Sequence, residues 1–160
     1  MVFFCPNCWS EVREDDEICP VCRRVIAPLD RASYFDKLTR ALRNPSADTR
    51  MRAAYLLGEI GDPRGIGPLA EILDRAGDKE NLFFLREIAV ALGKIDGKEA
   101  IPPLLRLMNN PSFLIREAAL KSLSRLKDEK TAEAIQKALK DPSTSIQELA
   151  GELLGKNSES

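Results

Sequence analysis

The chain has four cysteines, and they form two close pairs near its beginning: Cys5 with Cys8, and Cys19 with Cys22. Each pair has the pattern Cys-Pro-x-Cys, and ten residues separate the two pairs. A two-residue gap lets both thiolates of a pair face one ion, and four soft thiolates in a tetrahedron suit zinc. Such a site leaves no coordination position open, so we expect one structural zinc ion and no catalytic metal.

Three other chemistries use cysteines in pairs. A disulfide framework is typical of secreted chains, and we expect no signal peptide because Met1 to Phe4 run directly into Cys5. A redox pair normally opens a helix in a strand-rich fold, and no such pattern follows here. Iron needs the same four ligands and stays the alternative to zinc. Residues 1–27 hold too few apolar side chains to fold without a metal.

The cysteine pattern resembles the short zinc-ribbon modules found at chain termini. In those modules the residue after the second cysteine of each knuckle is usually glycine, whereas Trp9 and Arg23 occupy these positions here. The resemblance implies a small zinc-ribbon domain over residues 1–27, followed by a second domain over residues 31–155.

The second domain repeats one pattern. Asn44-Pro45-Ser46 recurs as Asn110-Pro111-Ser112 and as Asp141-Pro142-Ser143, and the last two copies are 31 residues apart. A period of this length is typical of a solenoid, in which stacked units bury a shared core. Each unit contains two runs with apolar residues at helical spacing. We expect eight helices, at about 31–43, 47–60, 64–76, 81–95, 98–109, 112–126, 129–140 and 143–154.

Glycine and proline residues are expected to end or bend these helices. Gly61 ends one helix, because glycine tolerates the left-handed conformation at a helix C-terminus. Pro68, Pro102 and Pro103 fall inside expected helices, where a proline removes a hydrogen bond and usually bends the axis.

A family resemblance follows from the run Arg-x-x-Ala-Ala-x-x-Leu-Gly-x-Ile-Gly-Asp-Pro, which begins at Arg50 and ends at Pro63. It resembles the HEAT-like repeats of bilin lyases, and less complete copies begin near Glu87, Ile115 and Ile146. The resemblance implies an all-α, HEAT-like superhelix of about four helical-hairpin repeats. Bilin-lyase-like activity is the third functional alternative that it suggests.

A solenoid commonly binds its partner along one row of helices on the concave face. The outward positions of that row follow from the apolar stripe, and some have the residue types that interfaces favour. We expect a protein partner at Met51, Tyr55, Glu59, Arg86, Val90, Lys94, Lys121 and Arg125. An ordinary solvated face stays the alternative. Arg50 and Arg116 each follow an Asn-Pro-Ser start, and a ladder of hydrogen bonds between stacked turns explains them better than ligand binding does.

Charge and composition bear on function. Residues 1–27 carry a net charge of −2 and the remainder +1, whereas nucleic-acid readers generally show a basic stripe. A nucleic-acid-associated role for the ribbon is therefore the runner-up. The chain has no histidine and no phosphate-binding glycine loop, so we expect no enzymatic activity. No apolar run could cross a bilayer. We expect a cytoplasmic scaffold or adaptor of unknown oligomeric state.

Overall fold

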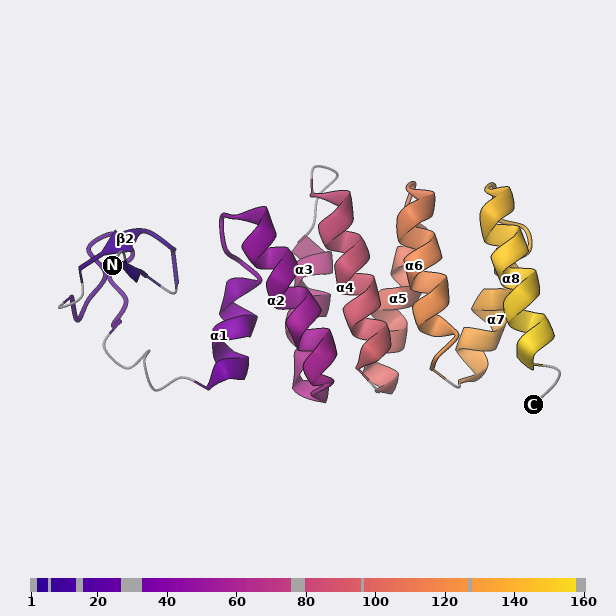
Figure 1. The fold of residues 1–160 in the computed structure, drawn as a ribbon, viewed down its shortest axis with the longest axis horizontal. Helices are drawn as coiled ribbons and strands as arrows, with labels where there is room; N and C mark the ends of the chain where they lie inside the picture. Colours follow the sequence, from indigo (N-terminus) through magenta and orange to yellow (C-terminus); the bar gives the residue numbers. More distant parts are fainter. Residues whose placement is uncertain are drawn as a thin grey trace.

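The computed structural model describes residues 3–5, 7–13, 16–26, 33–75, 80–95, 97–126 and 128–157. These residues form eight α-helices and one small sheet (Figure 1). The helices are α1 (Tyr34–Ala41), α2 (Ala47–Ile60), α3 (Ile66–Arg75), α4 (Leu82–Lys94), α5 (Ile101–Leu107), α6 (Phe113–Leu123), α7 (Glu129–Ala138) and α8 (Thr144–Asn157). The predicted all-α solenoid is confirmed.

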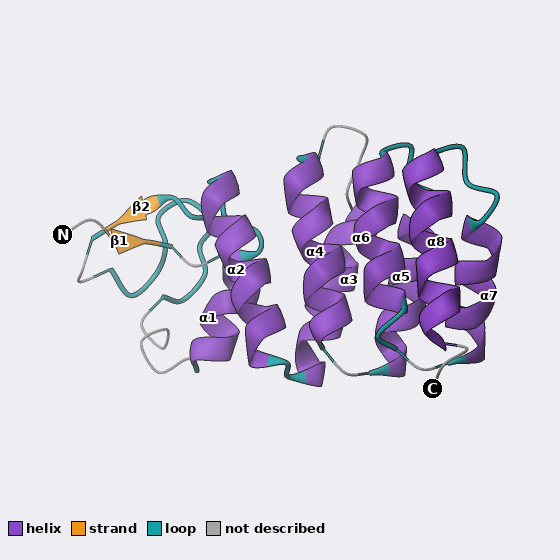
Figure 2. Ribbon diagram, turned by 45° about the vertical axis from the view of Figure 1, so that its right-hand side comes forward, coloured by secondary structure: helices purple, strands orange, loops and turns teal. Residues whose placement is uncertain are grey.

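The helices form two layers. Helices α2, α4, α6 and α8 pack side by side as one layer, and each pairs with the helix that precedes it in the sequence, so that α1, α3, α5 and α7 form the other (Figures 1 and 2). The core lies between the layers and is continuous along the stack, from Leu38 and Leu57 through Ile88 and Leu104 to Ile115. A second cluster around Leu120, Ile135 and Ile146 continues it to the last hairpin.

Side-chain caps begin two helices of the first layer, α2 and α4. The Ser46 hydroxyl accepts a hydrogen bond from the Thr49 amide, and Asn81 accepts from the amides of Phe83 and Phe84. Such side chains satisfy amides that have no partner inside the helix. At the other end of α2, Gly61 has a φ of 66°, as the sequence predicts. These local signals place α2 over the predicted residues.

The prolines lie at the starts of α-helices and not inside them, contrary to the sequence-based expectation. One-turn 3-10 helices at Pro63–Gly65 and Lys98–Ala100 precede α3 and α5, so the α-helices begin later than predicted. Pro68, Pro102 and Pro103 therefore lie in the first turn of α3 or α5. Amides in a first turn have no partner inside the α-helix, so a proline there removes no hydrogen bond.

Close contact between layer helices depends on glycine. A Cβ added at Gly93 of α4 would lie 2.3 Å from Cβ and 2.7 Å from Cα of Ser122 in α6. The Ser122 hydroxyl also donates a buried hydrogen bond of 2.8 Å to the Ala89 carbonyl of α4. Gly58 of α2 allows the same close approach to Ala91 of α4. The repeated Leu-Gly pair is thus a packing device.

The arginines that follow the Asn-Pro-Ser starts connect successive repeats. Arg116 donates to the carbonyls of Asn110 and Pro111 at 2.8 and 3.0 Å, and two of its nitrogens donate to the two carboxylate oxygens of Asp141 at 2.8 and 2.7 Å. Arg50 makes the equivalent carbonyl contacts and pairs with Glu80 at 3.1 Å. Their predicted structural role is confirmed.

Candidate functional site: a four-cysteine centre and an exposed helical face

The cysteine module, residues 3–26, lies beyond the α1 end of the stack (Figure 1). Its two short strands, β1 (Phe3–Phe4) and β2 (Glu11–Val12), are antiparallel, and Ile18 pairs with Val25 in a further bridge. Cys5, Val12 and Cys19 form its small buried cluster. The expected domain boundary, between residues 27 and 31, falls outside the described residues, so the two-domain division stays a prediction.

All four cysteine sulfurs lie within 4.8 Å of one another. The Sγ atoms of Cys5 and Cys22 are 3.6 Å apart, as are those of Cys8 and Cys19. Disulfide sulfurs are about 2.05 Å apart, so all four are free thiols. The sequence prediction that both pairs face one point agrees with this geometry.

The two knuckles have the same backbone geometry. The amides of Trp9 and Arg23 donate to the carbonyls of Cys5 and Cys19 at 2.7 and 2.9 Å. Trp9 has a φ of 60° and Arg23 a φ of 59°, in the left-handed region that favours glycine. The missing glycines therefore leave the turn in place, at a conformational cost of about 1 kcal/mol per residue.

Hydrogen bonds and burial shift the pKa values of Cys5, Cys8 and Cys19 in different directions. The Cys22 amide and then the Ser10 hydroxyl lower the pKa of Cys19 to about 6. The Ser10 hydroxyl also lowers the pKa of Cys8 below its ordinary value. Burial, in contrast, raises the pKa of Cys5 to about 11. Ser10 is a part of the centre that no sequence motif indicated.

The donor set fits a tetrahedral metal ion. Zinc–sulfur bonds of about 2.3 Å place the sulfurs of a tetrahedron about 3.8 Å apart, close to the pair distances here. Four thiolate ligands would fill the coordination sphere, so an ion here would hold the two knuckles together and leave no position for a substrate. The cluster can hold a metal ion.

The predicted partner residues lie on α2, α4 and α6, the row of helices in front in Figure 1, except Arg125, which follows α6. Of the eight predicted residues, Met51 and Val90 are half-buried and the others are exposed: Tyr55, Glu59, Arg86, Lys94, Lys121 and Arg125. Tyr55 has 41% of its surface exposed. The Lys94 ammonium lies 5.0 Å and the Arg52 guanidinium 5.7 Å from the Tyr55 ring centroid.

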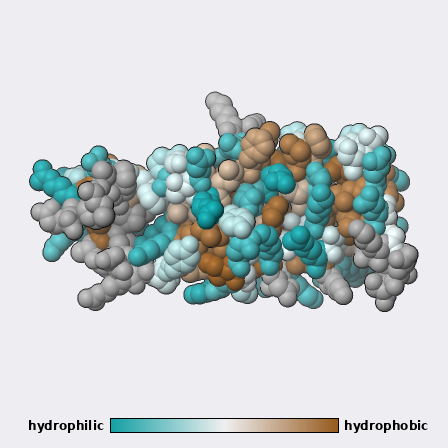
Figure 3. Space-filling view, viewed as in Figure 1, coloured by the Kyte–Doolittle hydropathy of each residue, from teal (hydrophilic) through white to brown (hydrophobic). Residues whose placement is uncertain are grey.

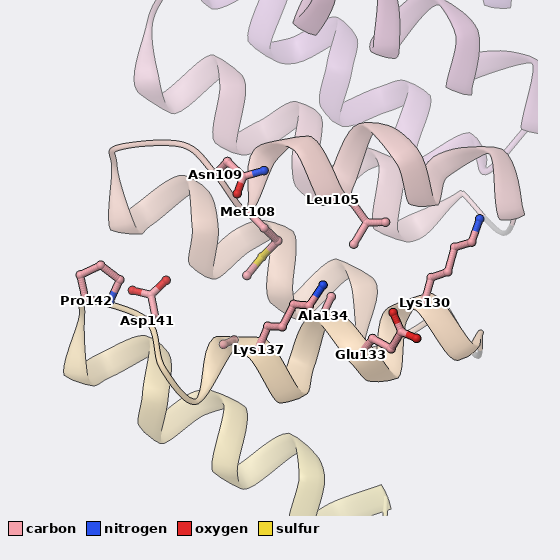
Figure 4. A pocket seen from close by; sticks show the side chains of 10 residues that line it. Leu105, Met108, Asn109, Lys130, Glu133, Ala134, Lys137, Asp141 and Pro142 are labelled. Carbon is pink, nitrogen blue, oxygen red and sulfur yellow. The ribbon is translucent and has the colours of Figure 1, made fainter.

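A groove that the sequence did not indicate lies between α5 and α7 (Figure 4). Its volume is about 610 Å³, and its walls combine apolar and charged side chains: Leu105, Met108, Asn109, Lys130, Glu133, Ala134, Lys137, Ala138, Asp141 and Pro142. Asp141 is already paired with Arg116. No motif marks the groove, because side chains from separate helices, among them Ala134 and Ala138 of α7, line it together.

Comparison with known proteins places the chain among repeat proteins. Residues 84–155 match the family of HEAT repeats, and residues 49–75 match the PBS lyase HEAT-like repeat. Phycocyanobilin lyase subunit alpha of Nostoc sp. is 33% identical over 103 residues, which cover 61% of this chain and 37% of that protein. Deoxyhypusine hydroxylase of Phaeosphaeria nodorum is 30% identical over 97 residues, which cover 60% of this chain and 29% of that protein.

A solved structure agrees. The complex of CpcE and CpcF of phycocyanin lyase from Nostoc sp. matches with a TM-score of 0.60 and 28% identity, over 68% of this chain and 43% of that chain. The chain thus spans less than half the length of each of these relatives.

These relatives correct one prediction. The expectation of no enzymatic activity is contradicted, because the similar proteins are a lyase subunit and a hydroxylase, and both names denote enzymes. The missing histidine and phosphate loop exclude particular mechanisms and not catalysis as such. Within the part of the chain that the structure describes, no helix is long and apolar enough to cross a bilayer. The cytoplasmic location stays a prediction.

The matches and the fold lead to one assignment. Two matched stretches, at residues 49–75 and 84–155, both belong to HEAT-type repeats and follow the helical hairpins of the stack. The chain is a HEAT-like repeat protein with a four-cysteine module at its N-terminal end.

Proposed function

We propose that this chain is a protein-binding scaffold, and that the outward side of α2, α4 and α6 docks a partner protein. Tyr55 carries the proposal. Its ring is exposed at the surface between two cations, Arg52 on its own helix and Lys94 on α4. Tyrosine and arginine are enriched among residues that dominate binding energy at protein interfaces.

The surroundings of Tyr55 suit an interface. Lys94 also pairs with Glu59. Lys94 of α4 therefore contacts both Tyr55 and Glu59 of α2. A side chain held in this way loses little conformational freedom when a partner covers it. Half-buried Met51 and Val90 add apolar surface nearby, and Figure 3 shows polar and apolar side chains interspersed over this face.

The relatives support a protein partner. The similar lyase structure is a complex of two proteins, and the matched curated relative is named as a lyase subunit. We therefore place this chain in an assembly with at least one other protein. The four-cysteine module would contribute a structural zinc ion, with Cys5, Cys8, Cys19 and Cys22 as ligands.

A bilin-lyase-like function is the second candidate. It is favoured by the match to phycocyanobilin lyase subunit alpha, which covers 61% of this chain. The chain incubated with phycocyanobilin and the captured partner would then yield a coloured covalent adduct. A partner that stays colourless under those conditions would leave the scaffold as the function.

The first test is capture of partners from the native lysate with nuclease present. We expect a specific protein to remain on the wild-type chain and to be lost with Tyr55→Glu. Leu139→Glu is the matched control. Leu139 follows α7 in the other helix layer, and its exposed fraction of 42% is close to the 41% of Tyr55. For the purified pair, we expect Tyr55→Glu to weaken binding by at least about 30-fold, the effect of a 2 kcal/mol hot spot.

Three outcomes would oppose the proposal. Equal loss of the partner with Leu139→Glu would mean that binding does not depend specifically on the outward side of α2, α4 and α6. Retention with Tyr55→Glu would place the interface elsewhere. Binding that disappears with nuclease, or falls steeply with added salt, would indicate phosphate contacts and move the function to nucleic acid.

A further inference from the structure

The cysteine module exposes an apolar patch formed by Ile18, Val21 and Val25. Their exposed fractions are 54%, 67% and 60%. Ile18 and Val25 are bridge partners, and Val21 lies in the turn between them, so the three belong to one hairpin-like segment. Such a concentration of exposed apolar side chains in a small module indicates a contact surface.

The stack has an uncovered groove at the end that is nearest this module. The groove lies between α1 and α2, has a volume of about 330 Å³, and is lined by Leu38, Ala41, Asp48, Thr49, Arg52, Ala53 and Leu56. On α2, Gly58 faces Ala91 of α4, whereas Leu56 lies about 160° away around the helix axis at 100° per residue. The groove is therefore the open end of the stack.

Inside the stack this side of a hairpin is covered by the preceding one. Helix α4 is covered by α2, and α6 by α4. The first hairpin has no preceding repeat among the described residues. Terminal repeats of a solenoid need a cap, because their core-type side chains otherwise meet water.

We propose that the cysteine module is this cap: its patch of Ile18, Val21 and Val25 docks into the groove between α1 and α2, in the place of a preceding repeat. The inference does not depend on the proposed partner face, which lies on the outward side of α2, α4 and α6. The groove rim carries one acid and one base, Asp48 and Arg52, so docking meets no net repulsion.

The connection allows the contact. Seven peptide steps separate Ile26 from Ser33, and an extended chain of that length spans up to about 24 Å. A short tether gives the patch an effective concentration in the millimolar range at the groove. A small apolar patch is sufficient under those conditions, although it would be too weak to bind between separate molecules.

Backbone amide NMR relaxation of the metal-loaded full chain tests the cap directly. The docked module must share the rotational correlation time of the helices. Amides of residues 16–26 that relax with a separate, shorter correlation time would overturn the proposal. This measurement needs no variant, so it stays decisive even if a substitution harms the module.

Val21→Asp then tests the patch, with Glu11→Lys as the control on another exposed part of the module. We expect Val21→Asp to give the module independent tumbling and to lower the melting midpoint of the helices by about 2–4 °C, whereas Glu11→Lys changes neither. Cobalt(II) absorption checks that the four-thiolate site is intact in both. An intact site with unchanged tumbling and melting in Val21→Asp would contradict docking through this patch.

Discussion

Arg116 and Asp141 form a buried ion pair whose occurrence along the repeats follows a rule. Arg50, Leu85 and Arg116 each lie four residues after a helix cap. Each arginine pairs with an acid of the next repeat: Arg50 with Glu80, one residue before Asn81, and Arg116 with Asp141, two residues before Ser143. After Leu85, the residue equivalent to Asp141 is neutral Asn110, which stands two residues before Ser112. The rule has a physical cause, because a buried carboxylate without a cation is costly.

The natural Leu–Asn pair suggests a double-substitution test. Arg116→Ala leaves the Asp141 carboxylate buried and unpaired, and we expect it to lower the free energy of unfolding by about 3 kcal/mol. Arg116→Leu with Asp141→Asn copies the neighbouring pair, and we expect a loss of about 1 kcal/mol or less. Asparagine keeps the turn, because Asn110 accepts from the Ser112 amide as Asp141 does from Ser143. Urea unfolding measures both; equal losses would contradict the interpretation.

The same pair makes stability depend on pH. The Arg116 guanidinium, and then the Ser143 amide, hold the pKa of Asp141 below its ordinary value. Since the folded pKa is the lower one, the unfolded chain binds the proton more readily, and the stabilisation is present above about pH 4. It is lost as the pH falls through the folded value. We expect Arg116→Leu with Asp141→Asn to unfold less steeply in acid than wild type, as measured by helical circular dichroism; parallel curves would exclude this pair as the cause.

At the scale of elements, Gly93 sets the distance between α4 and α6. Alanine there would bring Cβ to 2.7 Å from the Ser122 backbone, so the helices would have to separate. We expect Gly93→Ala to cost about 1–3 kcal/mol of stability, as overpacking does. Gly151→Ala in α8 is the control, because a Cβ there meets nothing within 4 Å and helix propensity favours alanine by about 1 kcal/mol. Thermal melting should fall for the first and rise for the second; no fall for Gly93→Ala would refute close packing here.

The elements also show how far the sequence alone could predict the fold. Caps and apolar periodicity placed α2 over its observed residues and all other helices within a few residues. The starts of α3 and α5 were predicted too early, because periodicity cannot separate a 3-10 turn at Lys98–Ala100 from the α-helix that follows it. The same turn moves Pro102 and Pro103 into a tolerated first-turn position, so their predicted place inside the helix was wrong.

At the scale of the whole molecule, the two parts differ in how well the sequence predicted them. The spacing of the cysteines predicted that Cys5, Cys8, Cys19 and Cys22 lie together. A two-residue gap lets the two sulfurs of a pair adopt few arrangements other than facing one point. The groove between α5 and α7 left no sequence signal, because it arises from the packing of separate helices. Catalysis was wrongly excluded from missing motifs, in a chain that covers less than half of its enzyme relatives.

The central claim is that the outward side of α2, α4 and α6 binds a protein, and site-specific photo-crosslinking tests it most directly. A photoreactive residue replaces Tyr55 in one chain and Leu139 in another, and each is irradiated in native lysate treated with nuclease. We predict a discrete protein adduct from position 55 and none from position 139. No adduct from position 55, or the same adducts from both positions, would contradict the claim.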